Sequence, residues 1–466
     1  MTDYLYEKIR QMFFDQIRNK TLMPGERLPS VRQLSRKLQV SIGTVQQAYA
    51  ALEDQDLIFP KDRSGYYVKP EKNVRQPETE SFTPVPSEVS VLDTAIEVTR
   101  SAARKDLLQL GSAVPDVSGK GVRQLHHEFK LQAHKIPNYE EDPSGYLSLR
   151  RRLANRMIDS GSNVDPDQIV ITAGCQEALT IALRCIAVPG DTILVESPCY
   201  FGVLQALELL DLKAVEIPVC PEHGIDTEKL ESILKKWPVK GMVMTPSFSN
   251  PTGSLCPDDK KQKILELLSA KDIPLIEDDV FAWLGYVENR PRSIYSYDRE
   301  GRVILCSSIS KMLCPDLRIG WMIAGRYTQK ARNLKFISTL SHPSHIQFAL
   351  DLFLSTRKLD RHLRTVTQVY IKKQQAMLNA ISRWFPESTR VTRPKGGFLC
   401  WVKLPDGVDG LNLYRDAITE GISIAPGVIF SPKDRYKNYI RLNYAVTSVE
   451  EINSAVKILA SLIKRQ

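Results

Sequence analysis

The stretch SSISKMLCPDLRIGW, residues 307–321, directly follows the apolar run RVILC and places Lys311 between serines and a proline-containing turn. An apolar run of this length is typical of a buried strand, and the Gly, Pro and polar residues after it are typical of a turn. Arg318 follows Lys311 in the same stretch. A solvated lysine needs no such surroundings, so the stretch indicates a buried strand that ends at a functional lysine.

Five further apolar runs of this form occur in the region that begins near residue 89. They are QIVITAG, DTILVES, KAVEIPV, GMVMTPS and PLIEDDV. Several are followed by a turn and then by apolar residues at helical spacing. Strands that alternate with helices predict an α/β fold with a largely parallel, buried sheet. Ligands in such folds bind at the carboxyl ends of the strands.

Residues with useful chemistry follow these predicted strands. In chain order they are Cys175 and Gln176, Tyr200, Asn250, Asp278, and Ser308 with Lys311 and Arg318. The first two open a predicted helix, whose free N–H groups can bind an anion. Arg441 stands inside the apolar run YIRLNYA, where a buried charge needs a partner.

Together these residues are the parts that pyridoxal 5′-phosphate requires. A desolvated lysine forms the Schiff base, and an aspartate keeps the pyridine nitrogen protonated. A helix terminus, a hydroxyl and an arginine bind the phosphate. Each residue alone has an ordinary explanation, such as a surface lysine, a cap or half of a structural ion pair. Their joint order along the chain is what indicates a cofactor site.

The N-terminal region has the pattern of a winged helix-turn-helix. Ser30 and Gln33 form a capping-box pattern that opens one helix, and Ser41 opens the next. The second helix is expected to bury one stripe, formed by Ile42, Val45, Tyr49 and Leu52. The stretch LIFPKDRSGYYV then predicts a strand, a turn and a strand, which would form the wing.

Residues 70–88 are rich in Pro, Ser, Thr and charge, so they predict an extended linker with little to bury. The predicted organisation is therefore a DNA-binding domain at 1–69, the linker at 70–88 and a larger domain at 89–466. The net charge of +9 fits polyanion binding without proving it.

The whole chain has the composition of an ordinary globular protein, with 42% hydrophobic and 25% charged residues, and we expect it in the cytoplasm because its cysteines show no disulfide pattern. We expect neither a signal peptide nor a membrane span, because the N-terminal residues are charged and the apolar runs are short. The eight cysteines form no C-x-x-C pair, and reduced thiols are expected. His342 and His345 lack a suitable partner nearby in sequence, so no metal site is expected.

The phrases MPGERLPSVRQLS, VSIGTVQQAYAALEDQDLI and SGYYV resemble the winged helix-turn-helix of GntR-type bacterial regulators and cover nearly all of the N-terminal region. The resemblance implies that double-stranded DNA is bound by Arg32, Ser41, Thr44, Gln46, Arg63 and Gly65. The residue types agree with these roles, because arginines neutralise phosphates and Gln and Thr can read base edges.

Residues 105–462 resemble the fold type I aminotransferases, and the whole chain resembles the MocR subfamily of GntR-type regulators. The resemblance implies that Lys311 forms the internal aldimine, that Asp278 partners the pyridine nitrogen and that Asn250 bonds the phenolic oxygen. It also implies that Tyr200 stacks on the cofactor ring and that Arg441 binds the α-carboxylate of a substrate. The implied phosphate ligands are Cys175, Gln176, Ser308 and Arg318, together with Tyr139 from across a dimer interface.

The sequence departs from the family pattern at two positions. Phe281 stands where many relatives have a tyrosine that bonds the phenolic oxygen, which puts efficient transamination in doubt. Cys175 stands where Ser or Thr is usual, so a hydroxyl is missing but a backbone N–H remains.

Three functions remain open at this point. The leading one is a homodimeric transcription regulator that senses an amino acid or related amine by forming an external aldimine. The second is a working aminotransferase in which DNA binding is secondary. The third, a dimerisation scaffold without cofactor, is disfavoured because a scaffold has no need for Lys311, Asp278 and Arg441 together.

Overall fold

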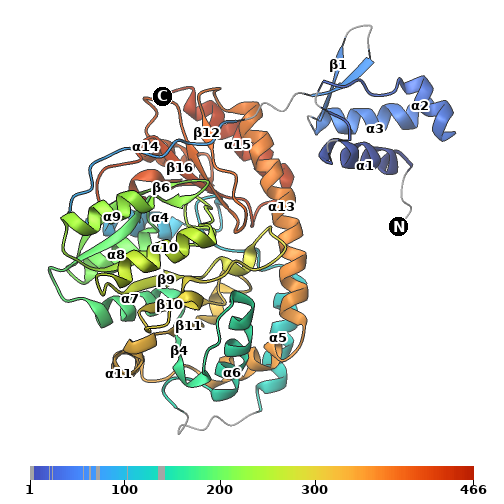
Figure 1. Cartoon of the computed structure of the whole chain (residues 1–466). Coiled ribbons are helices and arrows are strands. Elements are labelled where there is room, and N and C mark those ends of the chain that lie inside the picture. The colour runs from blue at the N-terminus through green and yellow to red at the C-terminus, as the bar shows by residue number, and fades with distance from the viewer. Residues whose placement is uncertain are drawn as a thin grey trace. The chain divides into compact units, whose positions relative to one another are not determined.

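The computed structural model describes residues 5–19, 21–23, 25–55, 57–61, 65–69, 74–101, 103–134 and 142–466 (Figure 1). The chain divides into two compact units, Met1–Asn73 and Val74–Gln466. We call them the smaller and the larger unit and describe each by itself.

The smaller unit contains three helices and a two-stranded antiparallel sheet among its described residues. Their bounds are α1 Leu5–Arg18, α2 Val31–Leu38, α3 Ile42–Asp54, β1 Ile58–Lys61 and β2 Gly65–Val68. The predicted capping box opens α2, because Ser30 accepts from the Gln33 amide and the Gln33 side chain accepts from the Ser30 amide. This arrangement confirms the winged helix-turn-helix prediction.

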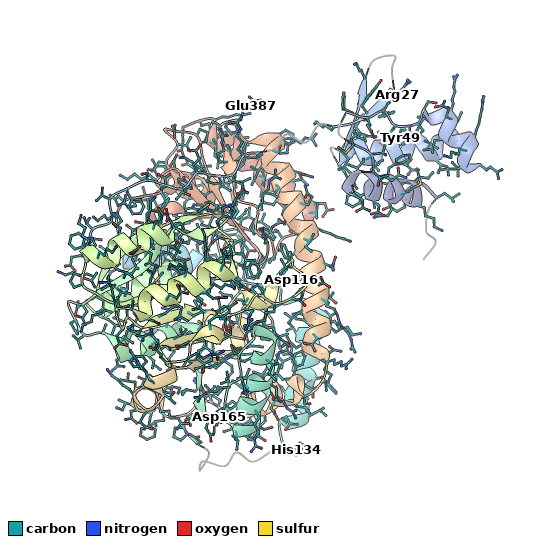
Figure 2. All side chains as sticks on the ribbon, in the orientation of Figure 1. Arg27, Tyr49, Asp116, His134, Asp165 and Glu387 are labelled. Carbon is teal, nitrogen blue, oxygen red and sulfur yellow. The ribbon has the colours of Figure 1, made fainter. Side chains whose placement is uncertain are left out.

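Tyr49 lies at the centre of the smaller unit's core (Figure 2). Its ring makes edge contacts with Phe13 and Tyr66, and its hydroxyl donates to the Pro29 carbonyl at 2.8 Å. The predicted stripe on α3 was wrong at one residue: Ile42 is 48% exposed, whereas Val45, Tyr49 and Leu52 are buried. Ile42 is the first residue of the helix, so the stripe meets the core only from the second turn onward.

The larger unit is built on a sheet that has eight strands within the described residues. Its spatial order is β4-β11-β10-β9-β8-β5-β6-β7. The strands are β4 Ile169–Thr172, β5 Thr192–Ser197, β6 Lys213–Cys220, β7 Gly224–Ile225, β8 Val239–Met244, β9 Leu275–Asp278, β10 Val303–Ser308 and β11 Gly320–Ile323. Strands β10, β9, β8, β5 and β6 pair in parallel, while β11 is antiparallel to both of its neighbours. The prediction of a mostly parallel sheet is confirmed.

Helices cover both faces of this sheet (Figure 1). The helices of the larger unit are α4 Leu92–Ser101, α5 Lys120–Gln132, α6 Leu147–Met157, α7 Cys175–Ile186, α8 Phe201–Leu209, α9 Thr227–Lys236, α10 Asp258–Ser269, α11 Thr328–Thr339, α12 Ser344–Leu354, α13 Lys358–Trp384, α14 Gly410–Thr419 and α15 Val449–Ile463. Helices α7 and α8 share one apolar cluster with the sheet, and α9 and α10 share another on the other face. Burial on both faces explains why the strands are apolar throughout rather than alternating.

A second, antiparallel sheet follows the long helix α13, which runs along one side of the larger unit (Figure 1). Its strands, in spatial order, are β12 Arg390–Val391, β13 Leu399–Lys403, β16 Tyr439–Asn443 and β15 Ala425–Pro426. A separate short pair joins β3 Leu108–Gln109 to β14 Ile422–Ser423. None of the helices in the described part of the chain is long and apolar enough to cross a membrane.

Residues 74–88 differ from the expectation of a linker that buries little. They are extended, but they lie against the larger unit, where Ser87 forms an antiparallel bridge with Ala214 and Pro77 is buried. A proline has no backbone N–H to donate to a sheet. The carbonyls and carboxylates of this segment nevertheless accept hydrogen bonds from the surface of the larger unit.

Candidate functional site

Strands β4, β5, β8, β9 and β10 run in the same direction, so their carboxyl ends meet at one edge of the sheet. The residues predicted from the sequence follow these ends: Cys175 after β4, Tyr200 after β5, Asn250 after β8, Asp278 at the end of β9 and Lys311 after β10. Arg441 reaches the same place from β16. The structure therefore gathers residues from six strands into one site.

Lys311 lies in the turn after β10, and its Nζ donates to the Ala113 carbonyl at 2.7 Å. Burial, together with the nearby charge of Arg441, lowers the pKa of Lys311 to about 8. Asp278 acts in the opposite direction on the pKa of Lys311. A substantial fraction of the amine is therefore neutral near physiological pH, which is the state that attacks a carbonyl.

Asp278 is buried at the end of β9. Its Oδ1 accepts from the Val280 amide at 3.1 Å and from the Cys175 Sγ at 3.6 Å. Among the described residues nothing donates to its second carboxylate oxygen. Burial raises the pKa of Asp278 to about 6, so the group is still mostly ionised above pH 7. This oxygen is available to a cationic N–H group of a ligand.

The first turn of α7 and the Arg318 guanidinium lie close together, and both are groups that can bind an anion. Gly174 precedes the helix with a φ of +87°, and a Cβ there would come within 2.9 Å of the Arg318 side chain. A Cβ at Gly320 would come within 2.5 Å of the Gly174 backbone. Arg318 itself has a left-handed backbone conformation with a φ of +50°, a strained state of the kind that occurs at functional sites. These glycines allow Arg318 and β11 to pack closely against the start of α7.

Two predicted phosphate ligands have other contacts in the structure. The Gln176 side chain donates to the Gly202 carbonyl at 2.6 Å and so joins α7 to α8. The Cys175 thiol points to Asp278, so the position contributes its backbone N–H rather than a side-chain donor to the anion region. Ser308 is buried at the end of β10, opposite Gly320.

Arg441 is a buried cation without an acidic partner among the described residues, and its side chain is only 1% exposed. One guanidinium nitrogen donates to Asn250 Oδ1 at 3.0 Å, another donates to the Gly111 carbonyl, and Nε has no partner. Phe430 and Phe201 flank the guanidinium at 5.2 and 5.9 Å. Burial lowers the pKa of Arg441 from its usual value, but arginine keeps its charge at neutral pH.

Aromatic residues complete the walls of the site. Tyr200 precedes α8. Burial, and to a smaller extent the charge of Asp278, raise the pKa of Tyr200 to about 12, so its hydroxyl stays protonated. Phe281 is buried against Phe398 with ring centroids 5.4 Å apart. Since Phe281 has no hydroxyl, its side chain offers no hydrogen bond to a ligand.

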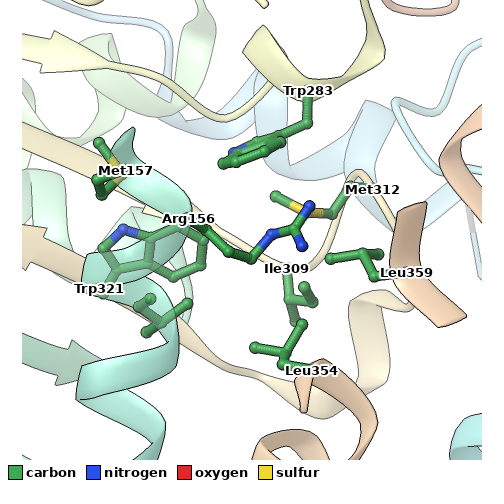
Figure 3. A pocket seen from close by; sticks show the side chains of 9 residues that line it. Arg156, Met157, Trp283, Ile309, Met312, Trp321, Leu354 and Leu359 are labelled. Atoms are coloured by element: carbon green, nitrogen blue, oxygen red, sulfur yellow. The ribbon is translucent and has the colours of Figure 1, made fainter. Parts of the chain in front are cut away.

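A small cavity lies beneath the lysine turn, lined by Leu153, Arg156, Met157, Trp283, Ile309, Met312, Trp321, Leu354 and Leu359 (Figure 3). Its only charged group, Arg156, lies 4.7 Å from the Trp283 ring centroid and pairs with Asp360 at 2.8 Å. The apolar lining supports Ile309 and Met312 on either side of Lys311. The cavity belongs to the core, and among the described residues Arg156 Nε and the indole nitrogens of Trp283 and Trp321 have no hydrogen-bond partner.

The segment 110–114, which was not predicted from the sequence, contributes backbone carbonyl oxygens to the site. Gly111 accepts from Arg441 and Ala113 accepts from Lys311. A Cβ at Gly111 would lie 2.6 Å from the Ile424 backbone, so only glycine fits there. Every residue has a backbone carbonyl, so the residue type does not reveal such an acceptor. The glycine at position 111 was the one signal in the sequence that two backbone segments come close together there.

In the smaller unit, Arg32 and Gln46 are exposed on α2 and α3. Ser41 caps α3 by accepting from the Thr44 amide at 3.0 Å, and the two hydroxyls are 2.8 Å apart. Gly65 opens β2 with a φ of +103°. Two predicted residues, Arg63 and Tyr139, lie outside the described residues.

The donor set fits pyridoxal phosphate. The free oxygen of Asp278 suits a protonated pyridine nitrogen, and the first turn of α7 with the Arg318 guanidinium beside Gly174 suits a phosphate. The orphaned Nε of Arg441 suits an additional carboxylate.

Comparison with known proteins agrees with this geometry. Residues 105–459 match the family described as aminotransferase class I and II, and residues 5–68 match the gntR family of bacterial regulatory proteins. The chain belongs to the aminotransferase class I and II family and carries a GntR-family DNA-binding domain at its N-terminal end. The cofactor of the larger unit is accordingly pyridoxal 5′-phosphate.

Particular relatives show the same fusion or the same fold. The uncharacterized HTH-type transcriptional regulator YjiR of Escherichia coli is 38% identical over 99% of both chains. The kynurenine aminotransferase of Pyrococcus horikoshii superposes with a TM-score of 0.73 at 30% identity, over 80% of this chain and 94% of that one. The α-aminoadipate aminotransferase LysN of Thermus thermophilus gives 0.70 at 30% identity, over 79% and 94%.

Proposed function

We propose that this protein is a homodimeric transcription regulator whose DNA binding responds to an amino acid or related amine at the cofactor site. The proposal rests on two features in one chain, the winged helix-turn-helix and a complete amine-binding site. The full-length similarity to YjiR, a protein named as a transcriptional regulator, supports the first feature. Such a regulator acts in the cytoplasm, where the DNA is.

The observation that carries the proposal is the buried Arg441 guanidinium without an acidic partner. A buried charge is costly unless a group of opposite charge joins it. Asn250 and Gly111 supply neutral acceptors only, and Nε has none. An α-carboxylate would accept from the guanidinium and neutralise it, so the effector class is an α-amino acid or a close analogue.

Lys311 and Asp278 provide the remaining chemistry. When bound, pyridoxal phosphate supplies an aldehyde that condenses with amines and a ring that accepts electrons. The lowered pKa of Lys311 keeps its amine available for that aldehyde. The Asp278 carboxylate would hold the pyridine nitrogen in its protonated form, and the first turn of α7 with Arg318 would hold the phosphate. LysN was solved with N-(5′-phosphopyridoxyl)-L-leucine, a molecule that joins these cofactor and amino acid parts.

The exposed polar face of the smaller unit would contact double-stranded DNA. Arg32 suits a phosphate, whereas Gln46 and Thr44 suit base edges in the major groove. Ser41, Arg63 and Gly65 complete the set that the resemblance implies. A homodimer would carry two such readers and would therefore favour repeated or palindromic half-sites.

The test uses the purified full-length protein. Visible absorbance is recorded while pyridoxal phosphate is added, first to the wild type and then to Lys311→Ala. We expect a band that borohydride abolishes in the wild type and that is missing in Lys311→Ala. Addition of single amino acids should then shift the band and change the affinity for a duplex selected from a randomised pool. Absence of the band in the wild type would refute the proposal.

A working aminotransferase is the second candidate, and one observation favours it. The partly neutral amine of Lys311 is suited to move a proton to or from a bound amino acid. Phe281 weighs against it, because the site lacks that hydroxyl. Repeated turnovers with an amino donor and a 2-oxo acid acceptor would establish the enzyme, whereas a stable spectral shift without turnover would favour the sensor.

A further inference from the structure

The chain enters the larger unit through an extended segment, residues 74–91, which we call the strap. The strap is the part of the larger unit that stands nearest to the DNA reader in sequence. The strap has two halves, residues 74–82 and residues 83–91, and these contact different parts of the larger unit.

The second half is anchored at the edge of the sheet away from the cofactor site. Ser87 exchanges two backbone hydrogen bonds with Ala214, at 2.8 and 2.9 Å, near the amino end of β6. The Trp237 indole donates to the Pro84 carbonyl at 3.2 Å, just before β8 begins. Since the site lies at the carboxyl ends of these parallel strands, this half of the strap has no short path to it.

The first half contacts the antiparallel sheet and the loop before β16. Glu80 accepts from the Tyr439 hydroxyl at 2.6 Å and pairs with Lys403 at 3.5 Å. The Phe82 ring lies under the Arg435 guanidinium, 3.7 Å from ring centroid to Cζ. A guanidinium stacked on an aromatic face at this distance is a favourable cation–π contact.

Arg435 also contacts a residue that supports the turn leading to Tyr200. Its Nε donates to Glu216 at 3.1 Å, and Glu216 is buried. The other oxygen of Glu216 accepts from Ser197 at 2.6 Å and from Ser431 at 2.8 Å. Ser197 ends β5 and begins the turn that carries Tyr200 into the site. One arginine therefore touches both the strap and the support of the turn that positions Tyr200.

An aromatic path joins the same half of the strap to Arg441. Tyr439 stacks on Trp401 with ring centroids 5.2 Å apart, and Trp401 contacts Phe430 at 5.1 Å. Phe430 flanks the Arg441 guanidinium at 5.2 Å, and its carbonyl accepts from the Cys199 amide at 2.8 Å. Every step of this path is a direct contact between buried or half-buried groups.

We propose that residues 74–82 form a latch that docks more tightly when a carboxylate occupies Arg441, with Arg435 as the joint between latch and site. This inference rests on the proposed function, because it takes the Arg441 ligand to be the effector carboxylate. An anion at Arg441 orders the neighbouring Phe430 and Tyr200 walls. Docking of the latch against walls that are already ordered then costs less conformational entropy. Binding of the carboxylate and docking of the latch therefore favour each other.

The experiment measures cleavage by a glutamate-specific protease in the intact full-length protein. Glu80 lies in the latch, and the exposed Glu88 lies in the anchored half, so cleavage after Glu88 is an internal reference. The probe is N-(5′-phosphopyridoxyl)-L-alanine, and pyridoxamine 5′-phosphate, which lacks the carboxylate, is the control ligand. Rates are followed by mass spectrometry, and ligand binding is measured separately by equilibrium dialysis.

We expect the alanine adduct to slow cleavage after Glu80 about fivefold relative to cleavage after Glu88, and pyridoxamine phosphate to leave the ratio nearly unchanged. Cleavage of a locally opened segment reports the population of its open state when reclosing is fast. Arg435→Gln should abolish the slowing while the adduct still binds. Trp237→Phe, which removes a strap contact in the anchored half, should leave the slowing intact.

Phe82→Ala provides a second variant, because it removes the latch side of the joint without unpairing Glu216. Cleavage after Glu80 should then be fast with either ligand. An unchanged or faster cleavage in the wild type with bound adduct would overturn the latch, as would full slowing in both Arg435→Gln and Phe82→Ala. Failure of the adduct to bind at all would instead overturn the proposed function.

Discussion

Two buried arginines of the larger unit have opposite surroundings. Arg150, on α6, is 2% exposed and pairs with Asp142 at 2.8 Å and Asp167 at 3.1 Å, while its Nε donates to a backbone carbonyl. Arg441, on β16, is equally buried but meets only neutral acceptors and keeps an unpaired Nε.

The difference separates a structural cation from one that is arranged for a ligand. Arg150 is satisfied by its own chain, so its guanidinium contributes to the stability of the fold. Arg441 retains part of the cost of a buried charge until an anion arrives, and that cost becomes binding energy for a carboxylate. The following predictions test whether this distinction holds.

Arg441→Gln should give the largest effect of these variants, a loss of affinity for a ligand that carries a carboxylate. The affinity for N-(5′-phosphopyridoxyl)-L-alanine should fall about 100-fold, roughly 2.7 kcal/mol, because charged hydrogen bonds to the carboxylate are lost. Affinity for pyridoxamine 5′-phosphate should change little, since it has no carboxylate. Both are measured by equilibrium dialysis. The melting temperature should not fall, and a large fall would show that Arg441 is structural.

Arg150→Gln should do the reverse. Loss of two ion pairs and the associated hydrogen bonds should lower the free energy of unfolding by about 2 kcal/mol. Affinity for the adduct should stay within about twofold of the wild type. Urea unfolding and dialysis on the same preparation give the comparison, and a binding defect without loss of stability would contradict it.

Lys311→Met extends the comparison to lysines. Burial lowers the pKa of Lys311 to about 8 from 10.5, so the folded cofactor-free protein binds fewer protons than the unfolded chain between those two pH values. Wild-type stability from this group therefore rises with pH across that window. This fall of the pKa costs the folded wild type about 3 kcal/mol at pH 7, and loss of the hydrogen bond to Ala113 offsets about 1 kcal/mol of the gain in the variant. We therefore expect Lys311→Met to stabilise the cofactor-free protein by about 2 kcal/mol at pH 7, with the gain shrinking towards pH 10.

A matched control is Lys261→Met. Lys261 is fully buried, but its Nζ donates to Asp258 at 3.0 Å and to the Arg292 carbonyl at 2.6 Å. Its removal should destabilise the protein at pH 7. Urea unfolding of both variants at pH 7 and pH 10 measures the two free energies of unfolding. Equal destabilisation by Lys311→Met and Lys261→Met would show that Lys311 is a structural lysine like Lys261.

Arg32→Gln should give the smallest effect, because Arg32 is exposed and its charge is screened. Affinity for the selected duplex should fall about fivefold at low salt. The slope of log affinity against log salt concentration should become less negative by about one for each reader that contacts DNA. Fluorescence anisotropy over a KCl series measures both quantities, and an unchanged salt slope would remove Arg32 from the phosphate contacts.

The parallel sheet and the meeting of Lys311 and Asp278 at one edge could be predicted because each depends on local pattern, whereas the place of Arg441 was implied only by the family resemblance. A buried strand is apolar throughout, and parallel strands bring whatever follows them to one edge. The capping box at Ser30 was predictable for the same reason, since Ser30 and Gln33 interact within one turn.

Features that depend on distant contacts were not predictable. Ile42 fits the stripe of α3 by spacing, but no partner reaches the first residue of that helix. The packing of residues 74–88 follows from the shape of a surface made by residues hundreds of positions later. The acceptors at Gly111 and Ala113 are backbone carbonyls, which every residue has.

The strap has a consequence for synthesis of the chain. Glu80 and Tyr439 are 359 residues apart, yet they are in direct contact. The reader, at the N-terminal end, can fold before most of the larger unit has been synthesised on the ribosome. Until Arg435 and Tyr439 have been made, the contacts that join the latch to the site are missing, so full docking marks a nearly finished chain. Fragments that end before residue 435 would carry a DNA reader that no effector controls.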